Sequence, residues 1–347
     1  MSMDTPLVSV CLPSLNTFPF LQERINTILG QTYTNWELIV IDSHSTDGSW
    51  ELFQKLARQD QRVSITQAPR GLYESWNNSI QRARGQYVYI ATSDDTMAPD
   101  CLEKLVASLE QHEDCDLAHC NLVVIDEKGT PVLDYQWPTS TVFAHGTPEL
   151  PYLPHIRRAP YDGLLHLTGR MVYQSITELL IRRSLFPRIG GFKGDWGSVG
   201  DLFWDMKAGL VANTVHVPDT WASWRRHSNQ ITVSATLLST EHARKVGEMI
   251  CEALIACQSY LAPQVLAGVK EHWLTWSSDM RNYYRGLRIR PNVLQRRLFQ
   301  VWQASKRAVR SEWIQQFSGR PKWPDRAPAD IRNWLESIGL GPVVLPL

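Results

Sequence analysis

The first 125 residues alternate between short apolar runs and longer segments with apolar residues at helical spacing. The runs LVSVCL at 7–12, WELIVI at 36–41 and YVYIA at 87–91 have the length of strands and are typical of strands buried on both faces. The segment 20–30 between the first two has a helical pattern and ends at Gly30, a good stop signal. Short links between such units require crossover connections, so we expect an α/β fold whose sheet is mostly parallel and covered on both faces.

The alternation of strand and helix patterns continues to about residue 125 and becomes less regular beyond it. Further strands are predicted at 63–66 and 117–125, and further helices over 49–57, 73–83 and 99–111. Beyond residue 126 we expect an ordered loop at 138–160, a strand followed by a helix over 175–186, a glycine-rich stretch at 189–200, a helix at 201–210 and helical structure from 236 to 315.

Composition excludes several classes of protein. Lys and Arg total 35 and Asp and Glu total 35, so the net charge is zero and a polyanion binder that works by bulk charge is excluded; we expect no nucleic-acid partner. No run of about 18 apolar residues occurs, and the first residues do not resemble a signal peptide, so we expect a cytoplasmic protein. The six cysteines form no Cys-x-x-Cys pair, which disfavours a zinc site and a disulfide framework.

Polar residues cluster directly after three of the expected strands. Ser14 and Asn16 follow the first, residues 42–47 follow the second, and residues 93–95 follow the YVYIA strand. Parallel strands place their carboxyl ends at one edge of the sheet, where ligands bind in open α/β folds. The sequence therefore predicts a binding site at this edge.

Two adjacent carboxylates, Asp94 and Asp95, are the most informative of these residues. Such a pair at a strand end is costly unless a cation lies beside it, and a divalent metal shared with a diphosphate is the natural partner. The alternative is that one of them caps the next helix, because Pro99 lies just inside it. Spacing alone does not separate the two interpretations.

Four segments, taken in order and spacing, resemble the family 2 glycosyltransferases of the GT-A class. They are LVSVCLPSLN at 7–16, GQTYTNWELIVIDSHSTDGS at 30–49, GLYESWNNSIQRARGQYVYIATSDDTMAPD at 71–100, and RIGGF with VGDLFW within 188–204. The resemblance covers residues 6–230. It implies a GT-A-like nucleotide-binding fold with a mixed, mostly parallel central sheet flanked by helices. The helical pattern beyond residue 236, outside the resemblance, adds a helical C-terminal extension.

The end of the resemblance near residue 230 and the helical pattern beyond it divide the chain into two parts. Residues 1–235 would form the glycosyltransferase domain, with a nucleotide-binding half at 1–125 and an acceptor half at 126–235. Residues 236–347 would form a helical C-terminal region.

The resemblance assigns roles to the polar residues at the sheet edge. Asp95 would hold Mn²⁺ or Mg²⁺ against the diphosphate of a sugar nucleotide, and Asp94 would bind the ribose or order the water around the metal. The other residues expected to bind the nucleotide are Ser14, Asn16, Asp42, Ser43, Ser93, Arg70 and Asn77. Ser43 replaces a carboxylate that meets uracil in several members, so UDP is favoured while dTDP and GDP stay open. Asp47 is expected to brace its loop, since Ser-Thr-Asp-Gly is good turn chemistry.

Asp201 follows the glycine-rich stretch and matches the catalytic base of inverting family members. One carboxylate that takes the proton of the acceptor hydroxyl, together with one metal on the departing diphosphate, suffices for a single in-line displacement. The alternative is that Asp201 is only a helix N-cap. Asp195 and Asp205 are rival carboxylates, and Asp205 would lie one turn further along the same helix face.

The segment WRRHS at 224–228 resembles an Arg-x-His segment of the family. His227 would ligate the metal, and Arg225 and Arg226 would pair with the diphosphate. The alternative for His227 is a purely structural role. The Gln-x-x-Arg-Trp motif of processive synthases is absent, which favours the addition of one sugar per encounter.

Residues 281–310 are basic and aromatic and lie outside the resemblance. A peripheral contact with anionic lipid at the inner face of the membrane, a solvated helical face and a homodimer contact are all open.

The sequence thus predicts an inverting, metal-dependent transferase acting on a glycan or lipid-linked acceptor in surface polysaccharide biosynthesis. One rival is a sugar-nucleotide-binding protein without catalysis. The other is a dinucleotide-dependent oxidoreductase, which is disfavoured because residues 13–16 contain no glycine.

Overall fold

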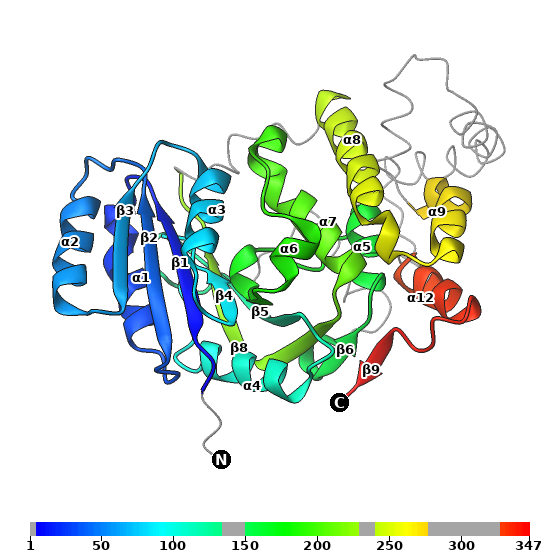
Figure 1. Cartoon of the computed structure of the whole chain (residues 1–347), viewed down its shortest axis with the longest axis horizontal. Coiled ribbons are helices and arrows are strands. Elements are labelled where there is room, and N and C mark those ends of the chain that lie inside the picture. The colour runs from blue at the N-terminus through cyan, green and yellow to red at the C-terminus, as the bar shows by residue number, and fades with distance from the viewer. Residues whose placement is uncertain (1–4, 134–149, 229–239, 277–326) are drawn as a thin grey trace.

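The computed structural model describes residues 5–133, 150–228, 240–276 and 327–347. These residues form a three-layer α/β/α architecture in which one central sheet carries helices on both faces (Figure 1). The N-terminal strands and helices form one end of the layer, and the helices α5 to α9 and α12 gather at the other end.

The strands of this sheet are β1 (Val8–Ser14), β2 (Trp36–Asp42), β3 (Val63–Gln67), β4 (Tyr87–Ile90), β5 (Leu117–Ile125), β6 (His155–Arg157), β7 (Leu179–Arg182), β8 (Thr214–Arg225) and β9 (Val344–Pro346). The α-helices are α1 (Phe18–Leu29), α2 (Ser49–Gln59), α3 (Leu72–Arg82), α4 (Cys101–Gln111), α5 (Tyr161–Leu167), α6 (Leu185–Ile189), α7 (Gly200–Val211), α8 (Thr240–Cys257), α9 (Pro263–Trp276) and α12 (Ala327–Ser337). Short 3₁₀ turns are η2 (Leu150–Tyr152), η3 (Ile176–Glu178), η4 (Gly194–Val199) and η6 (Gln258–Tyr260).

The strand order is β3-β2-β1-β4-β7-β5-β8-β6-β9. The neighbours from β3 to β4 are all parallel, as the crossover pattern predicts. The other half of the sheet is mixed, because β7 is antiparallel to both β4 and β5, whereas β5 and β8 are parallel. The predicted mixed sheet is confirmed, but parallel pairing dominates only in the half built from the first 90 residues.

The strand directions decide where the loops meet. Since β7 runs against both β4 and β5, strands β4, β5 and β8 point the same way, together with β1, β2 and β3. The carboxyl ends of these six strands therefore lie along one edge of the sheet. This edge receives the polar loops that the sequence analysis singled out.

The core has two parts, one on each face of the sheet. In β1, Val8, Val10 and Leu12 pack with α1, α2 and α4, whereas Cys11 packs with α3 on the opposite face. This period of two is the geometry of a strand buried on both sides. The elements predicted between residues 7 and 125 are confirmed, with ends that shift by one or two residues.

The described part of the C-terminal region is mostly helical, as expected, but it also contains strand β9. Strand β9 pairs antiparallel with β6 and extends the sheet, and α12 packs against α5. Helix α8 packs against α7, and its apolar residues belong to the same core as those of α3. The predicted basic segment at 281–310 and most of the predicted loop at 138–160 lie outside the described residues.

The described residues contain no helix that is both long enough and apolar enough to cross a membrane. The six cysteines are free thiols, and all but Cys251 are buried.

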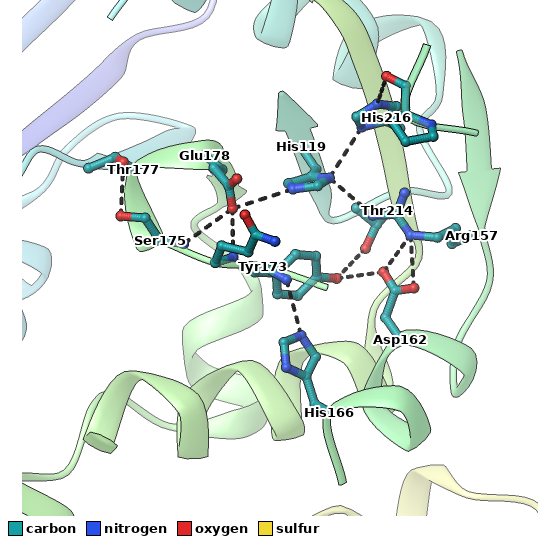
Figure 2. A network of polar contacts seen from close by, with 12 residues as sticks. His119, Arg157, Asp162, His166, Tyr173, Ser175, Thr177, Glu178, Thr214 and His216 are labelled. Carbon is teal, nitrogen blue, oxygen red and sulfur yellow. Dashed lines mark hydrogen bonds and ion pairs between the residues drawn. The ribbon is translucent and has the colours of Figure 1, made fainter. Parts of the chain in front are cut away.

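A buried polar network joins β5, β6, β8 and α5 (Figure 2). At its centre Arg157 is 1% exposed, and its Nε donates to both carboxylate oxygens of Asp162 at 2.8 and 2.9 Å. Its other nitrogens lie 2.7 Å from Nε2 of His155 and 3.3 Å from Nδ1 of His119. Tyr173 donates to Asp162 at 2.8 Å. A buried charge is tolerated when it is paired and hydrogen-bonded in this way.

Four histidines of this region are buried, namely His119, His155, His166 and His216. Burial, reinforced by the nearby positive charge of Arg157, lowers the pKa of His119, His155 and His166 from 6.5 to about 3. The fold therefore holds these imidazoles neutral across the ordinary pH range.

The lowered pKa values of these histidines predict that the folded protein loses stability in acid. Between the unfolded pKa near 6.5 and the folded value near 3, the unfolded chain binds a proton at each imidazole and the folded chain does not, so stability falls as pH falls. His166→Leu removes one such group. We expect the slope of the unfolding free energy against pH, from urea titrations between pH 4 and 6, to decrease by about 1.4 kcal/mol per pH unit. An unchanged slope would show that His166 is protonated in the folded protein.

Candidate functional site

The loops after β1 and β2 are joined to each other at the carboxyl edge of the sheet. The N–H of Asn16 donates to Oγ of Ser45 at 3.0 Å, and Oδ1 of Asn16 accepts from the N–H of Thr46 at 2.9 Å. The N–H of Ser43 donates to the carbonyl of Ser14 at 2.8 Å. Ser14, Asn16 and Ser43 thus lie together as predicted, while their contact with a nucleotide remains a prediction.

Two carboxylates brace the loop after β2. Asp47 accepts from the N–H groups of Phe18 and Ser49 at 2.9 and 3.1 Å, as predicted for a bracing residue. Asp42 is fully buried and accepts from the N–H and Oγ of Ser45 and from Gln67. Both residues therefore shape the loop. A nucleotide contact for Asp42 stays a prediction.

Residues 94–96, called the acidic loop below, are held by Ser223 and Arg225 of β8 and by His227 just after it. Oγ of Ser223 accepts from the N–H of Thr96 at 2.7 Å, and the N–H of Arg225 donates to Oδ1 of Asp95 at 2.6 Å. Alternate residues of a strand share one face, so this face of β8 aligns the acidic loop at the edge where β4 and β8 both end.

The two aspartates have different surroundings. Asp95 is 2% exposed, and its second oxygen accepts from Oγ1 of Thr92. Burial, followed by the charge of Asp94, raises the pKa of Asp95 to about 7. The side chain of Asp94 is 23% exposed, and its Oδ2 lies 3.0 Å from Nε2 of His227. Neither caps α4, whose N-cap is Asp100.

Both oxygens of Asp95 accept hydrogen bonds inside the protein. A carboxylate oxygen that accepts one hydrogen bond keeps a second lone pair, so a metal contact for Asp95 stays a prediction. Asp94 and His227 present an oxygen and a nitrogen donor side by side, a pair that suits a divalent cation. Among the described residues no group of three or more His, Cys, Asp and Glu side chains converges as a metal site, so a cation here would take its other ligands from substrate and water.

The guanidinium of Arg225 is 1% exposed. Its Nε donates to the carbonyl of Asp94 at 2.5 Å, and Nη1 donates to the carbonyls of Asp126 and Glu127 at 3.2 Å each. Nη2 pairs with Glu23 of α1 at 2.6 Å. Arg225 therefore ties the turn after β5 and helix α1 to the acidic loop. Its expected pairing with a diphosphate stays a prediction.

Asn77 contacts the glycine-rich loop. Its Nδ2 donates to the carbonyl of Phe192 at 2.8 Å, and its Oδ1 accepts from the N–H of Phe192 at 2.9 Å. The amide therefore supports this loop, and a nucleotide contact for Asn77 stays a prediction. Arg70 and Arg226 are both exposed, and their contacts with a ligand remain predictions, as does that of the buried Ser93.

Asp201 lies in the first turn of α7, two residues after the N-cap Val199, so it is not an N-cap. Its Oδ1 accepts from the N–H of Leu202 at 2.9 Å and from the hydroxyl of Tyr73 at 3.3 Å. Tyr73 is in the first turn of α3, which follows the carboxyl end of β3. Asp201 therefore lies at the same edge of the sheet as Asp94. Burial raises its pKa above the ordinary value.

The rival carboxylates have other positions. Asp205 is 5% exposed, and burial together with the charges of Asp201 and Glu178 raises its pKa well above the usual range. Asp195 is exposed in η4. Neither matches the half-buried position of Asp201 beside Tyr73.

The residues that support this site, above all Glu23, Thr92 and Ser223, carry no motif of their own and were not predicted. The available signal was the alternate spacing of Ser223 and Arg225, continued by His227 just beyond the strand, but the strand β8 was not predicted.

Replacement of Arg225 tests its supporting role. Arg225→Met leaves the carbonyls of Asp94, Asp126 and Glu127 without this buried donor, so we expect a loss of about 3 kcal/mol in the free energy of unfolding measured in urea. The matched control is Arg58→Met at an exposed position of α2, which should change it by less than about 0.5 kcal/mol. Equal effects of the two replacements would contradict the assignment.

Comparison with known proteins agrees with this geometry. Residues 9–184 match the family model described as glycosyl transferase family 2. Among curated relatives, the putative teichuronic acid biosynthesis glycosyltransferase TuaG of Bacillus subtilis is 30% identical over 129 residues, which are 37% of this chain and 51% of TuaG. The putative glycosyltransferase EpsE of Bacillus subtilis is 36% identical over 149 residues, which are 41% of this chain and 53% of EpsE. The chain thus spans about half the length of these two relatives.

A longer match and a structural match extend the comparison. An uncharacterized glycosyltransferase of Haemophilus influenzae is 30% identical over 249 residues, covering 70% of this chain and 72% of the relative. The crystal structure of S. aureus TarS 1–349 in complex with UDP-GlcNAc aligns with a TM-score of 0.54 at 15% identity over 81% of this chain and 79% of TarS 1–349, which shows a shared fold. The chain belongs to glycosyl transferase family 2.

Proposed function

We propose that this protein is an inverting, metal-dependent glycosyltransferase that moves one sugar from a nucleoside diphosphate donor to a hydroxyl acceptor. The observation that carries the proposal is the shared position of Asp94, His227 and Asp201 at the carboxyl edge of the sheet. Membership of glycosyl transferase family 2 supports the reaction class.

The donor side of the proposal depends on Asp94 and His227. Their oxygen and nitrogen donors fit Mn²⁺ or Mg²⁺, which when bound would neutralise charge on the leaving diphosphate. The protein contributes the alignment of these two side chains, through Arg225 and the strand β8. Arg226 is exposed beside His227 and would add positive charge near the diphosphate.

The acceptor side depends on Asp201. Its carboxylate would accept the proton of the attacking hydroxyl as the bond to the anomeric carbon forms and the bond to the diphosphate breaks. A single displacement from the face opposite the leaving group inverts the anomeric centre. The raised pKa of Asp201 makes it a stronger base than an exposed aspartate.

The donor we favour is a UDP-sugar. S. aureus TarS, which shares the fold, has been crystallised with UDP and with UDP-GlcNAc. The pocket for the nucleotide would be formed by Ser14, Asn16, Ser43 and Ser93 with Asp42 bracing the loop beneath. Arg70, exposed just before α3, would reach the phosphates or the base.

For the acceptor we propose a glycan or lipid-linked glycan of a surface polysaccharide. The relative TuaG is named for teichuronic acid biosynthesis, which supports this class. A cytoplasmic location, with contact at the inner face of the membrane for a lipid-linked acceptor, belongs to the same proposal, as does a homodimer.

Two carboxamide variants separate the two halves of the mechanism. Asp201→Asn should reduce kcat by about 10²–10⁴-fold and leave the Kd for UDP with Mn²⁺ unchanged, because the base acts only in the chemical step. Asp94→Asn should weaken UDP binding in the presence of Mn²⁺, as measured by calorimetry.

The control is Asp219→Asn, since this side chain is 65% exposed and pairs with Lys104 on the surface. It should alter neither quantity. Full turnover in Asp201→Asn would exclude Asp201 as the base, and donor binding with no transfer by the unmodified protein would favour a non-catalytic sugar-nucleotide-binding protein.

A thermal-shift panel tests the donor and the metal together. A bound donor raises Tm by mass action, so we expect a UDP-sugar with Mn²⁺ to raise Tm more than GDP-, dTDP- or CMP-sugars. Chelation with EDTA should remove most of the shift in the unmodified protein. A shift that survives chelation would contradict a metal-bridged diphosphate.

A further inference from the structure

The hydroxyl of Tyr73 lies between α3 and the first turn of α7. It accepts from the N–H of Gly200 at 2.9 Å and lies 3.3 Å from Oδ1 of Asp201, to which it donates. Tyr73 is 4% exposed, and its ring packs edge-on against Trp76 and stacks with Phe192. One hydroxyl thus contacts both the backbone at the start of α7 and the carboxylate proposed as the base.

The chain around Gly200 is shaped to allow this contact. A Cβ at Gly200 would lie 2.7 Å from the ring of Tyr73 and 2.3 Å from the carbonyl of Lys193, so no other residue fits without displacement. One helical turn after Tyr73, Asn77 holds Phe192 through two hydrogen bonds. A Cβ at Gly191 would lie 2.3 Å from Oδ1 of Asn77. The side chains at i and i+4 of α3 therefore hold both ends of the loop that leads to the base.

The hydroxyl is one of two donors to the carboxylate within the described residues; the other is the N–H of Leu202. Other titratable or charged groups on the elements packed around α7 include Asp205 and Lys207 in α7, Glu178 in η3, Glu74 in α3, Lys193 and Asp195 in the glycine-rich loop, and Glu248 and Glu252 in α8.

We propose that Tyr73 is the positioning residue of the base: it orients the carboxylate of Asp201 and anchors the first turn of α7 to α3. The inference rests on the proposed function, in which Asp201 takes the proton of the acceptor. Tyr73 acts through Asp201 and needs no contact with substrate. Because α3 begins at the sheet edge that carries the donor loops, the same helix sets the base against the donor site.

The effect of this hydrogen bond on the pKa of Asp201 has a sign that can be measured. A hydrogen bond donated to the ionised carboxylate favours the charged form, and this bond is among the influences that lower the pKa of Asp201 against the effect of burial. Loss of the hydroxyl should therefore raise the pKa of Asp201. The acidic limb of the kcat profile, where the base becomes protonated, would then move to higher pH.

The test is Tyr73→Phe, which keeps the ring and its packing. We expect kcat to fall by roughly 10-fold or more from the loss of orientation, the acidic limb of kcat to move up by about half a pH unit or more, and the Kd for UDP with Mn²⁺ to stay unchanged. The matched control is Tyr161→Phe, a buried tyrosine of α5 whose hydroxyl donates to the carbonyl of Pro328 at 3.2 Å. Tyr73→Phe loses two hydrogen bonds and Tyr161→Phe loses one, so both should lower stability, and only Tyr73→Phe should shift the pH profile.

A pH profile and kcat in Tyr73→Phe equal to those of Tyr161→Phe would overturn the inference. Gly200→Ala is the second variant should Tyr73→Phe not fold, because the added methyl group displaces the first turn of α7 from Tyr73 and should give the same kinetic signature. Asp201→Asn is measured alongside. Full turnover in Asp201→Asn would refute both the role of Asp201 as base and this inference. Loss of turnover in Asp201→Asn together with an unshifted pH profile in Tyr73→Phe would refute this inference alone.

Discussion

The buried guanidinium of Arg225 is the contact on which the rest of the site depends. It reaches the carbonyl of Asp94, the turn after β5 and Glu23 of α1, so three segments distant in sequence meet at one side chain. The planar guanidinium spreads five N–H donors over three nitrogens in a fixed fork, whereas the three donors of a lysine all lie on one nitrogen. The acidic loop therefore keeps its shape because the end of β8 delivers this group to the sheet edge.

Burying a charged group costs free energy, and in the second half of the sheet ion pairs and hydrogen bonds offset this cost. Arg157 is paired with Asp162 in two hydrogen bonds, and the histidines around it stay neutral. The acidic loop follows the same rule, because Asp95 accepts hydrogen bonds from Thr92 and from the backbone of Arg225. Its neighbour Asp94, which is partly exposed, lies against His227 instead. Tyr73 of α3 provides a comparable fixed contact for Asp201 of α7.

The local pattern was sufficient to predict the elements of residues 7–125, the clustering of polar loops at one edge and the family. Hydrophobic periodicity and turn chemistry depend on neighbours in the chain, which a sequence displays directly. The local pattern was not sufficient to predict β6, β8 and β9. Strands β6 and β9 are only three residues long, and the pairing of β8 with β5 shifts register between Cys120 and Asn121 of β5. Such strands are decided by their partners in the sheet.

The sequence by itself determined which residue types are available at the edge: two adjacent aspartates, a late aspartate after glycines, and an arginine two residues before a histidine. Only the tertiary structure decided which of them face outward. Asp94 and Asp95 are neighbours of the same chemical type, and nothing in their order distinguishes them; the N–H of Arg225, 130 positions away, takes one inward. In the same way, Arg225 and Asn77 have the chemistry of ligand-binding residues, but the backbone carbonyls and N–H groups packed around them use that chemistry within the fold.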